Sequence, residues 1–216
     1  MRYIRYSLRE TAGSGKIVIP VPESYKDCFT LIQSDKYRYV GKIVPIWKIW
    51  LKTLMNPTEA AFFWWRMWAY KGWMRPLCTL MHHHYDHKYG MLLATTKVGY
   101  GLFHGIRFNS RINVRTLIGN NVNISQFSNF GSNTDRGLKV GNNVYIAPHV
   151  CTVSDNNIGS NCCIGAGSIV TKDLMAGNTY AGNPARIIGE NKHPEYIHNP
   201  YPIPPIPEDK IEDIEI

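Results

Sequence analysis

Two histidines in the second half of the chain are candidates for acid–base chemistry. His104 lies in GYGLFHGIRFN and His149 lies in IAPHV. Histidine is the side chain whose ordinary pKa lies nearest to neutrality, so it can take a proton from a hydroxyl or an amine at pH 7. A weak nucleophile that loses its proton in this way can attack a carbonyl carbon. The two side chains are therefore candidates for a general base.

A second group of histidines raises the question of a metal site. The segment MHHHYDHKYG supplies metal-ligand types at close spacing, and on one helix His83 and His87 share a face. This group is too far in sequence from His104 and His149 to predict one site with them. We therefore expect no bound metal. The residues of the group are His82, His83, His84, Asp86 and His87.

Repeats of six residues build the elements that must position His104 and His149. An apolar residue recurs every six positions, and glycine directly follows several of these residues. A period of six fits neither a helix face nor a simple alternating strand, and asparagine between the repeats tolerates left-handed backbone conformations. The pattern predicts short strands joined by sharp corners, with the aliphatic side chains stacked inside. The repeated positions are Ile118, Ile124, Phe130, Val140, Ile146, Thr152, Ile158, Ile164 and Val170.

Composition bounds the protein class. The 216 residues are 44% hydrophobic and 19% charged, which is typical of a globular protein. A net charge of +8 suits a polyanionic partner, and a phosphate-rich cofactor satisfies it without nucleic acid. The five cysteines show no CxxC spacing, and the start MRYIRYSLRE has no apolar run behind it. We expect reduced thiols and a cytoplasmic protein, with the inner face of the membrane as a second location.

The repeat region resembles the hexapeptide-repeat acyltransferases. The motifs IGNNVNISQFSNFGS, VGNNVYIAP, IGSNCCIGAGSIVTKD and AGNPARIIG carry the resemblance, which is closest to the serine acetyltransferase-like branch that includes bacterial polysaccharide O-acetyltransferases. It covers roughly residues 90–189. The resemblance implies a mainly β fold, a left-handed parallel β-helix, which forms a homotrimer and binds acetyl-CoA between neighbouring coils.

Three regions follow along the chain. Residues 1–89 are expected to form an N-terminal arm and an α-helical cap, residues 90–189 the β-helix, and residues 190–216 a proline-rich, acidic tail. Residues 1–28 show no strong pattern, and helices are expected in TLIQSDKYRYV and on both sides of Asn56-Pro57. The tryptophan-rich stretches between Ile46 and Leu80 are either core helices or a peripheral contact with a membrane.

The resemblance also implies roles for single residues. His104 matches the family's general base, although the segment between Gly101 and His104 is shorter than in the family pattern. Serine acetyltransferases carry an aspartate before the base where this chain has Phe103, a second histidine where it has Gly137, and an upstream carboxylate near Met91. Because those polar partners of serine are missing, a sugar hydroxyl is favoured as the acceptor over serine.

The cofactor and acceptor sites are expected at corners of the coil. The resemblance places the pantetheine arm of acetyl-CoA along small residues and its phosphates beside cations. The matching residues are Gly131, Ala166, Gly167, Lys172 and Arg186. Asp135 and Arg136, in a loop that interrupts the six-residue register, either hold the acceptor or form a solvated turn.

Several alternatives stay open at this point. Serine O-acetyltransferase is the first, and an amino-sugar N-acetyltransferase follows it. The same coil also occurs in γ carbonic anhydrase-like metalloenzymes, which need three histidine ligands, and a non-catalytic trimeric scaffold is a further alternative. The tail is expected to wrap the trimer or to be disordered, and its acidic end is a candidate cover for the cationic phosphate site.

Overall fold

The computed structural model describes residues 1–105, 109–132 and 134–214, and residues 92–181 form a left-handed coil of short parallel strands. Each turn of the coil contributes one strand to each of three sheets. The six-stranded sheet contains β4 (Phe103–His104), β7 (Asn123–Ile124), β10 (Tyr145–Ile146), β13 (Cys163–Ile164), β15 (Asn178–Ala181) and the antiparallel β16 (Arg186–Glu190). The five-stranded sheet contains β3 (Leu92–Leu93), β5 (Arg111–Ile112), β8 (Asn129–Phe130), β11 (Cys151–Thr152) and β14 (Ile169–Val170). The third sheet of the coil contains β6 (Leu117–Ile118), β9 (Lys139–Val140) and β12 (Asn157–Ile158).

The six-residue repeat becomes the interior of this coil, as predicted. Ile118, Ile124 and Val140 are at most 1% exposed, and equivalent residues of successive turns stack in register. Glycine is required where the coils touch at Gly119, Gly141 and Gly159, because a Cβ at Gly119 would lie 2.4 Å from the carbonyl oxygen of Gly141. The predicted role of asparagine is confirmed at Asn121, Asn143 and Asn161, which adopt left-handed backbone angles.

Four helices cap the first turn of the coil: α1 (Tyr25–Val40), α2 (Ile46–Met55), α3 (Pro57–Trp68) and α4 (Arg75–Tyr89). A buried ion pair joins the cap to the coil. Arg66 donates two hydrogen bonds of 2.8 Å to Asp35, and it also donates to the carbonyl oxygens of Val98 and Gly99. Asp35 in turn accepts from the backbone N–H of Leu102, so the otherwise free edge of the first turn is bonded to the helices.

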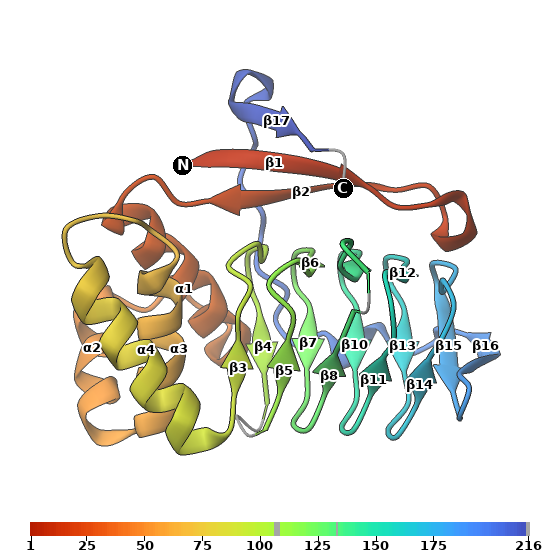
Figure 1. Cartoon of the computed structure of the whole chain (residues 1–216). Coiled ribbons are helices and arrows are strands. Elements are labelled where there is room, and N and C mark those ends of the chain that lie inside the picture. Colours follow the sequence, from red (N-terminus) through yellow and green to blue (C-terminus); the bar gives the residue numbers. More distant parts are fainter. Residues whose placement is uncertain (106–108, 133, 215–216) are drawn as a thin grey trace.

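The N-terminal residues, for which no regular structure was predicted, form a β-hairpin. Strands β1 (Arg2–Ser7) and β2 (Lys16–Val21) pair antiparallel, and the hairpin lies over the β6–β9–β12 sheet along the top of the coil in Figure 1. Tyr6 is 1% exposed, and its hydroxyl donates to the carbonyl oxygen of Val140 at 2.6 Å. The alternation of Ile17 and Ile19 toward this sheet was the signal for a strand.

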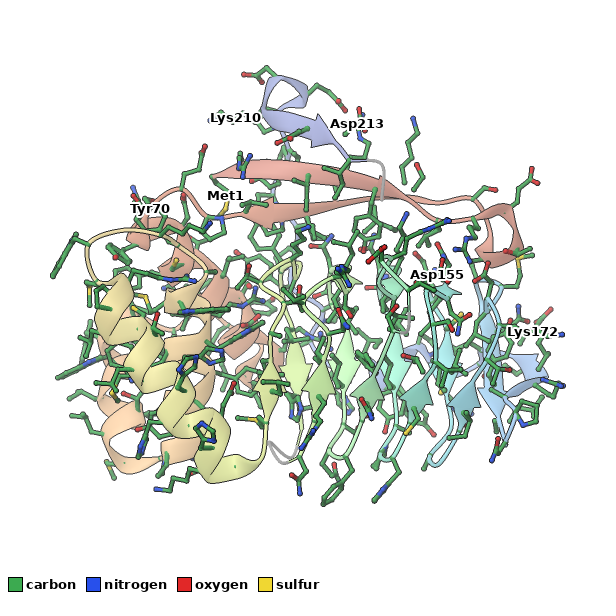
Figure 2. All side chains as sticks on the ribbon, in the orientation of Figure 1. Met1, Tyr70, Asp155, Lys172, Lys210 and Asp213 are labelled. Carbon is green, nitrogen blue, oxygen red and sulfur yellow. The ribbon has the colours of Figure 1, made fainter. Side chains whose placement is uncertain are left out.

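The tail packs against the coil and the cap of the same chain, so the expected disorder is wrong for its described residues. It passes behind the coil in Figure 1, where Asn123 donates to the carbonyl oxygen of Tyr196 and Arg38 to that of His198. Its end, β17 (Ile211–Asp213), pairs with β1. The short helices are η1 (Glu10–Ala12) in the turn of the hairpin, and η2 (Pro194–Tyr196) and η3 (Glu208–Lys210) in the tail. The acidic end pairs with Arg2 and Arg5 of β1, whereas Lys172 lies at the far end of the coil in Figure 2. It therefore does not cover the predicted phosphate site.

Candidate functional site

His104 lies inside the coil rather than at an open edge. It pairs with Ile124 of the next turn, and its side chain occupies the same interior column as Ile124 and Ile146. The residue is 1% exposed, its Nε2 lies 3.2 Å from Oγ of Ser110, and its ring centroid is 5.3 Å from that of Phe62. In the single chain the imidazole is therefore buried, and the role of His104 as the general base stays a prediction.

The pairing of strands in successive turns explains why His104 is buried. Val98 pairs with Ile118, and His104 follows Val98 by the same six residues that separate Ile118 from Ile124. The coil therefore keeps a six-residue step between Val98 and His104, and the shorter segment inferred from the resemblance stays a prediction. Steps of six back from Ile118 reach Ile112 but not His104, because eight residues separate these two interior positions. Residues 106–108, which follow it, lie outside the described part of the chain.

Three predicted cofactor residues and His149 lie along one edge of the five-stranded sheet, which we name the first corner (residues 125–128, 147–150 and 165–168). Ala166 and Gly167 are exposed there, and the N–H of Gly167 donates to the carbonyl oxygen of Pro148 at 2.9 Å. Gly167 has a φ of +71°, so glycine suits the turn itself. His149 is also exposed, and its ring stacks on Phe127. Arg186 follows the loop whose Ala185 donates to Ile169 at the end of this corner.

The other predicted residues lie along the opposite edge of the same sheet, the second corner (residues 113–116, 153–156 and 171–173, with the loop after β8). Gly131 begins that loop, and Lys172 is exposed in the last turn. Asp135 lies 3.4 Å from Arg115, and Arg136 lies 3.8 Å from Asp155. The single chain therefore divides the predicted cofactor residues between two edges of the five-stranded sheet, and Asp135 and Arg136 share an edge with Gly131 and Lys172 only.

The five-stranded sheet carries apolar side chains on its outer face and along both edges. Leu92 is 51% exposed, Val153 on the second corner is 42% exposed and Phe127 on the first corner is 40% exposed. In the described part of the chain, the hairpin covers the β6–β9–β12 sheet and the tail covers the six-stranded sheet, but no segment was found over this face.

A hollow of about 350 Å³ opens at the end of the first corner nearest the helices, between α4 and the first strands of the five-stranded sheet. His83, Asp86 and His87 of α4 and Arg111 of β5 line it. Asp86 is 9% exposed and its carboxylate lies 3.5 Å from Nε2 of His82. Burial raises the pKa of Asp86 to about 7, although a hydrogen bond from the backbone of Leu93 acts in the opposite direction. A carboxyl with that pKa can take up or release a proton near neutrality.

His82 complements Asp86 by staying neutral. Burial lowers the pKa of His82 to about 4, and the charges of His83 and Arg75 lower it further. The ring of His82 packs 4.6 Å from that of Trp68. From the sequence, this segment was considered only as a metal site. The raised pKa of Asp86 depends on burial, which the sequence does not reveal. Among the described residues, no group of three or more His, Cys, Asp and Glu side chains is arranged to hold a metal ion.

A second hollow, of about 430 Å³, opens beside the second corner and the end of α3. Its charged lining residues are Lys71, Arg75, Lys97, Arg115 and Asp135. The guanidinium of Arg75 lies 4.3 Å from the Trp68 ring and donates to the carbonyl oxygen of Trp68. No feature of the sequence pointed to this cluster, because its cations come from three separate segments.

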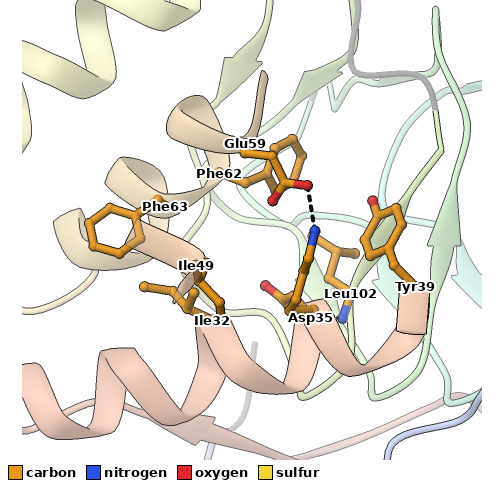
Figure 3. Close-up of a pocket in the computed structure, with 9 residues that line it drawn as sticks. Ile32, Asp35, Tyr39, Ile49, Glu59, Phe62, Phe63 and Leu102 are labelled. Carbon is orange, nitrogen blue, oxygen red and sulfur yellow. Dashed lines mark hydrogen bonds and ion pairs between the residues drawn. The ribbon is translucent and has the colours of Figure 1, made fainter. Parts of the chain in front are cut away.

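A smaller cavity lies between α1, α3 and the coil, and Figure 3 shows the residues that line it. Lys36 and Glu59 form a 2.6 Å ion pair at its wall. Its volume of about 20 Å³ leaves room for one water molecule and not for a substrate. It is a packing feature of the cap.

Comparison with curated proteins supports the sequence interpretation. Over 103 residues the chain is 34% identical to the mitochondrial serine acetyltransferase 3 of Arabidopsis thaliana, and over 53 residues it is 49% identical to the galactoside O-acetyltransferase of Escherichia coli K12. These matches cover 46% and 24% of this chain, and the chain spans only about a quarter (26%) of each relative. No protein-family model matches the chain.

Solved structures agree on the fold. The serine acetyltransferase of Neisseria gonorrhoeae superposes with a TM-score of 0.61 at 21% identity, over 77% of this chain and 66% of that one. The enzyme of Vibrio cholerae gives a TM-score of 0.64 at 18% identity, over 82% and 72% of the two chains. The coil is thus a hexapeptide-repeat β-helix, and the predicted resemblance to the acetyltransferases built on this fold is confirmed.

Proposed function

We propose that this protein transfers an acetyl group from acetyl-CoA to a hydroxyl acceptor. The similarity of its repeat region to proteins named as serine and galactoside acetyltransferases carries the proposal. In the reaction the acceptor oxygen bonds to the thioester carbon, the carbon–sulfur bond breaks, and CoA leaves as a thiol. A serine acetyltransferase structure with bound CoA is among the structural neighbours, at 21% identity, which supports the same cofactor here.

The site is proposed to lie between neighbouring chains of a trimer. A ring of identical subunits joins two different surfaces at each contact. In such a ring the first corner of one chain, with Ala166 and Gly167, meets the second corner of the next, with Gly131 and Lys172. This arrangement reunites the residues that the single chain keeps apart, and it covers the exposed apolar side chains of the five-stranded sheet.

A sugar hydroxyl is favoured as the acceptor, and serine is the second candidate. The galactoside O-acetyltransferase match has the higher identity, whereas the serine acetyltransferase match is longer. The residues that would hold the carboxylate and ammonium of serine were not found in the sequence motifs. An assay that follows thiol release from acetyl-CoA with L-serine, free sugars and nucleotide sugars separates these acceptors.

Two side chains are candidates for the base. The resemblance predicts His104, and Asp86 is the second candidate because it lines the hollow beside the first corner and burial raises its pKa to about 7. His104→Leu preserves an apolar interior column, so a stable but inactive variant supports His104 as the base. Asp86→Asn keeps a side-chain oxygen that accepts from the backbone N–H of Leu93, but it cannot act as a base. The true base loses at least about a hundredfold in kcat when replaced, and Asp209→Asn on the tail serves as the control.

Helix α2 is the proposed site of the peripheral membrane contact that the sequence left open. Trp47, Trp50 and Leu54 of this helix are 58%, 46% and 65% exposed, and they share one face with Leu51 and Met55. Lys48 and Lys52 border that face, and residues 37–58 contain no acidic side chain. Tryptophan and lysine around an apolar face suit an anionic membrane surface. In the described residues, no helix is long and apolar enough to cross a bilayer.

Sedimentation with vesicles tests this contact. The wild type is expected to sediment with vesicles that contain anionic phospholipid and not with neutral ones, whereas Trp50→Glu/Leu54→Glu stays in the supernatant with both. Equal binding of the two proteins would show that α2 is not the contact. A change in oligomeric state in the double variant without lipid would instead assign the face to a second copy of the chain.

A further inference from the structure

We propose that the hollow beside the second corner binds phosphate groups of the acceptor, so that the acceptor is a phosphate-bearing sugar. The inference rests on the proposed acetyl transfer for its biological meaning and on the lining of the hollow for its chemistry. Four of the charged lining residues are cations, Lys71, Arg75, Lys97 and Arg115. The fifth is the carboxylate of Asp135, whose side chain is fully exposed and lies 3.4 Å from Arg115.

The excess positive charge is local. In the adjoining hollow, which shares Lys71 and Lys97, the carboxylates of Glu23 and Glu212 join Arg2, so the charges there are nearly balanced. Four cations that line one site with a single carboxylate repel one another, and a multivalent anion relieves that repulsion. Two of the cations are arginines, whose planar guanidinium groups form paired hydrogen bonds with phosphate oxygens.

The side chains are held for this role. Arg75 lies over the Trp68 ring and is bonded to a backbone carbonyl, so part of its donor set is already oriented. Burial lowers the pKa of Arg75, which makes an anionic neighbour favourable for it. A Cβ at Gly137 would lie 2.3 Å from the backbone of Arg115, so glycine allows the loop after β8 to pack there and to place Asp135 at the mouth.

The phosphates of CoA do not account for this hollow. Their predicted partners, Lys172 and Arg186, lie at the end of the coil away from the helices. Arg115 follows β5 and Lys172 follows β14, three strand spacings apart, which is roughly 14 Å along the coil. A volume of about 430 Å³ fits a sugar phosphate or diphosphate. Free serine, with a single carboxylate, does not need four cations.

Calorimetry with inorganic pyrophosphate tests the site directly. The full-length protein is first saturated with CoA, so that the CoA phosphate site is filled. The wild type is expected to bind pyrophosphate, and Lys71→Gln/Arg115→Gln, both at exposed positions, to bind it about tenfold or more weakly. The matched control Lys26→Gln/Lys192→Gln removes the same charge elsewhere and is expected to bind like the wild type.

Failure to bind pyrophosphate in the presence of CoA, or equal affinity in the wild type and Lys71→Gln/Arg115→Gln, overturns the proposal. An assay of thiol release then shows whether the phosphate site alone is wrong or the proposed acetyl transfer is wrong as well. Turnover with a neutral sugar, unchanged in the variant, refutes the phosphate site while the acetyl transfer stands. Faster turnover with a nucleotide diphosphate sugar than with a lipid diphosphate sugar in vesicles identifies a free acceptor, and the reverse identifies a membrane-bound one; either result requires a raised KM in the variant.

Discussion

The coil has three faces, and the protein covers two of them with its own chain. Over the β6–β9–β12 sheet the hairpin buries Ile4, Tyr6 and Leu117 together. Over the six-stranded sheet the tail is held by Arg38, which is 0% exposed and donates to the carbonyl oxygens of Gly101 and His198 and to Asn123. In the described part of the chain no segment covers the five-stranded sheet, which carries exposed apolar side chains between two hollows.

The difference separates residues that stabilise the fold from residues that are available for binding. Polar groups on the covered faces, such as Asn123 and Arg38, have their hydrogen bonds within the chain. On the remaining face Asp86, Lys97 and Arg115 line open hollows. Substitutions on the covered faces should therefore change stability first, and substitutions around the five-stranded sheet should change assembly and activity first.

The largest effect is expected from Arg38→Met. The variant leaves the acceptors at Gly101 and Asn123 without their buried donor and detaches the tail, because the side chain makes all three of these bonds. The free energy of unfolding should fall by about 3–5 kcal/mol. Urea denaturation measures it. A loss below 1 kcal/mol would mean that the tail does not depend on this arginine.

The remaining face should respond in assembly. Val153→Glu/Ile169→Glu places charges where neighbouring chains are proposed to meet, and both residues are partly exposed in the single chain. The trimer should dissociate at concentrations about a hundredfold higher than for the wild type, with circular dichroism unchanged. Analytical ultracentrifugation measures this. Leu54→Glu on α2 is the matched control, and an intact trimer in the double variant would place the interface elsewhere.

Replacing Asp86 should change activity and stability in opposite directions. The folded-state pKa is about 7 against an ordinary value of 3.8, so the folded chain holds the proton more tightly and stability falls as the pH rises between these values. Asp86→Asn removes this cost, and above pH 7 it should be more stable than the wild type by about 1–2 kcal/mol. The difference should vanish near pH 4. A more stable but inactive variant marks a functional carboxylate, whereas a less stable one marks a structural partner of Leu93.

Periodicity made the coil predictable, because the core contacts of a repeat lie at fixed sequence separations. Ile118, Ile124 and Val140 could be placed from the repeat alone, and so could the corner asparagines. The interior position of His104 could not be read from the repeat in this way, because eight residues separate it from Ile112 and steps of six do not reach it.

The candidate site was less predictable, since its residues meet only in three dimensions. Lys71, Lys97 and Arg115 come from the cap and two levels of the coil, and no local pattern links them. The pKa of Asp86 depends on burial by α4 and β3, which a run of histidines does not reveal. The exposed corner that holds Ala166 and Gly167 could be expected from the repeat, whereas their role in binding the cofactor stays a prediction from the resemblance.

The smallest effect is expected where the tail meets the hairpin at the surface. Glu212 forms a 2.9 Å ion pair with Arg2, and both side chains are more than half exposed. Exposed pairs gain little, because water and salt screen them and ordering the side chains costs entropy. Glu212→Gln should therefore change the free energy of unfolding by less than about 1 kcal/mol, and thermal denaturation at low and high salt measures it. A larger loss would mean that β17 is held by this pair rather than by its backbone bonds to β1, and the tail would then be a salt-sensitive cover of the coil.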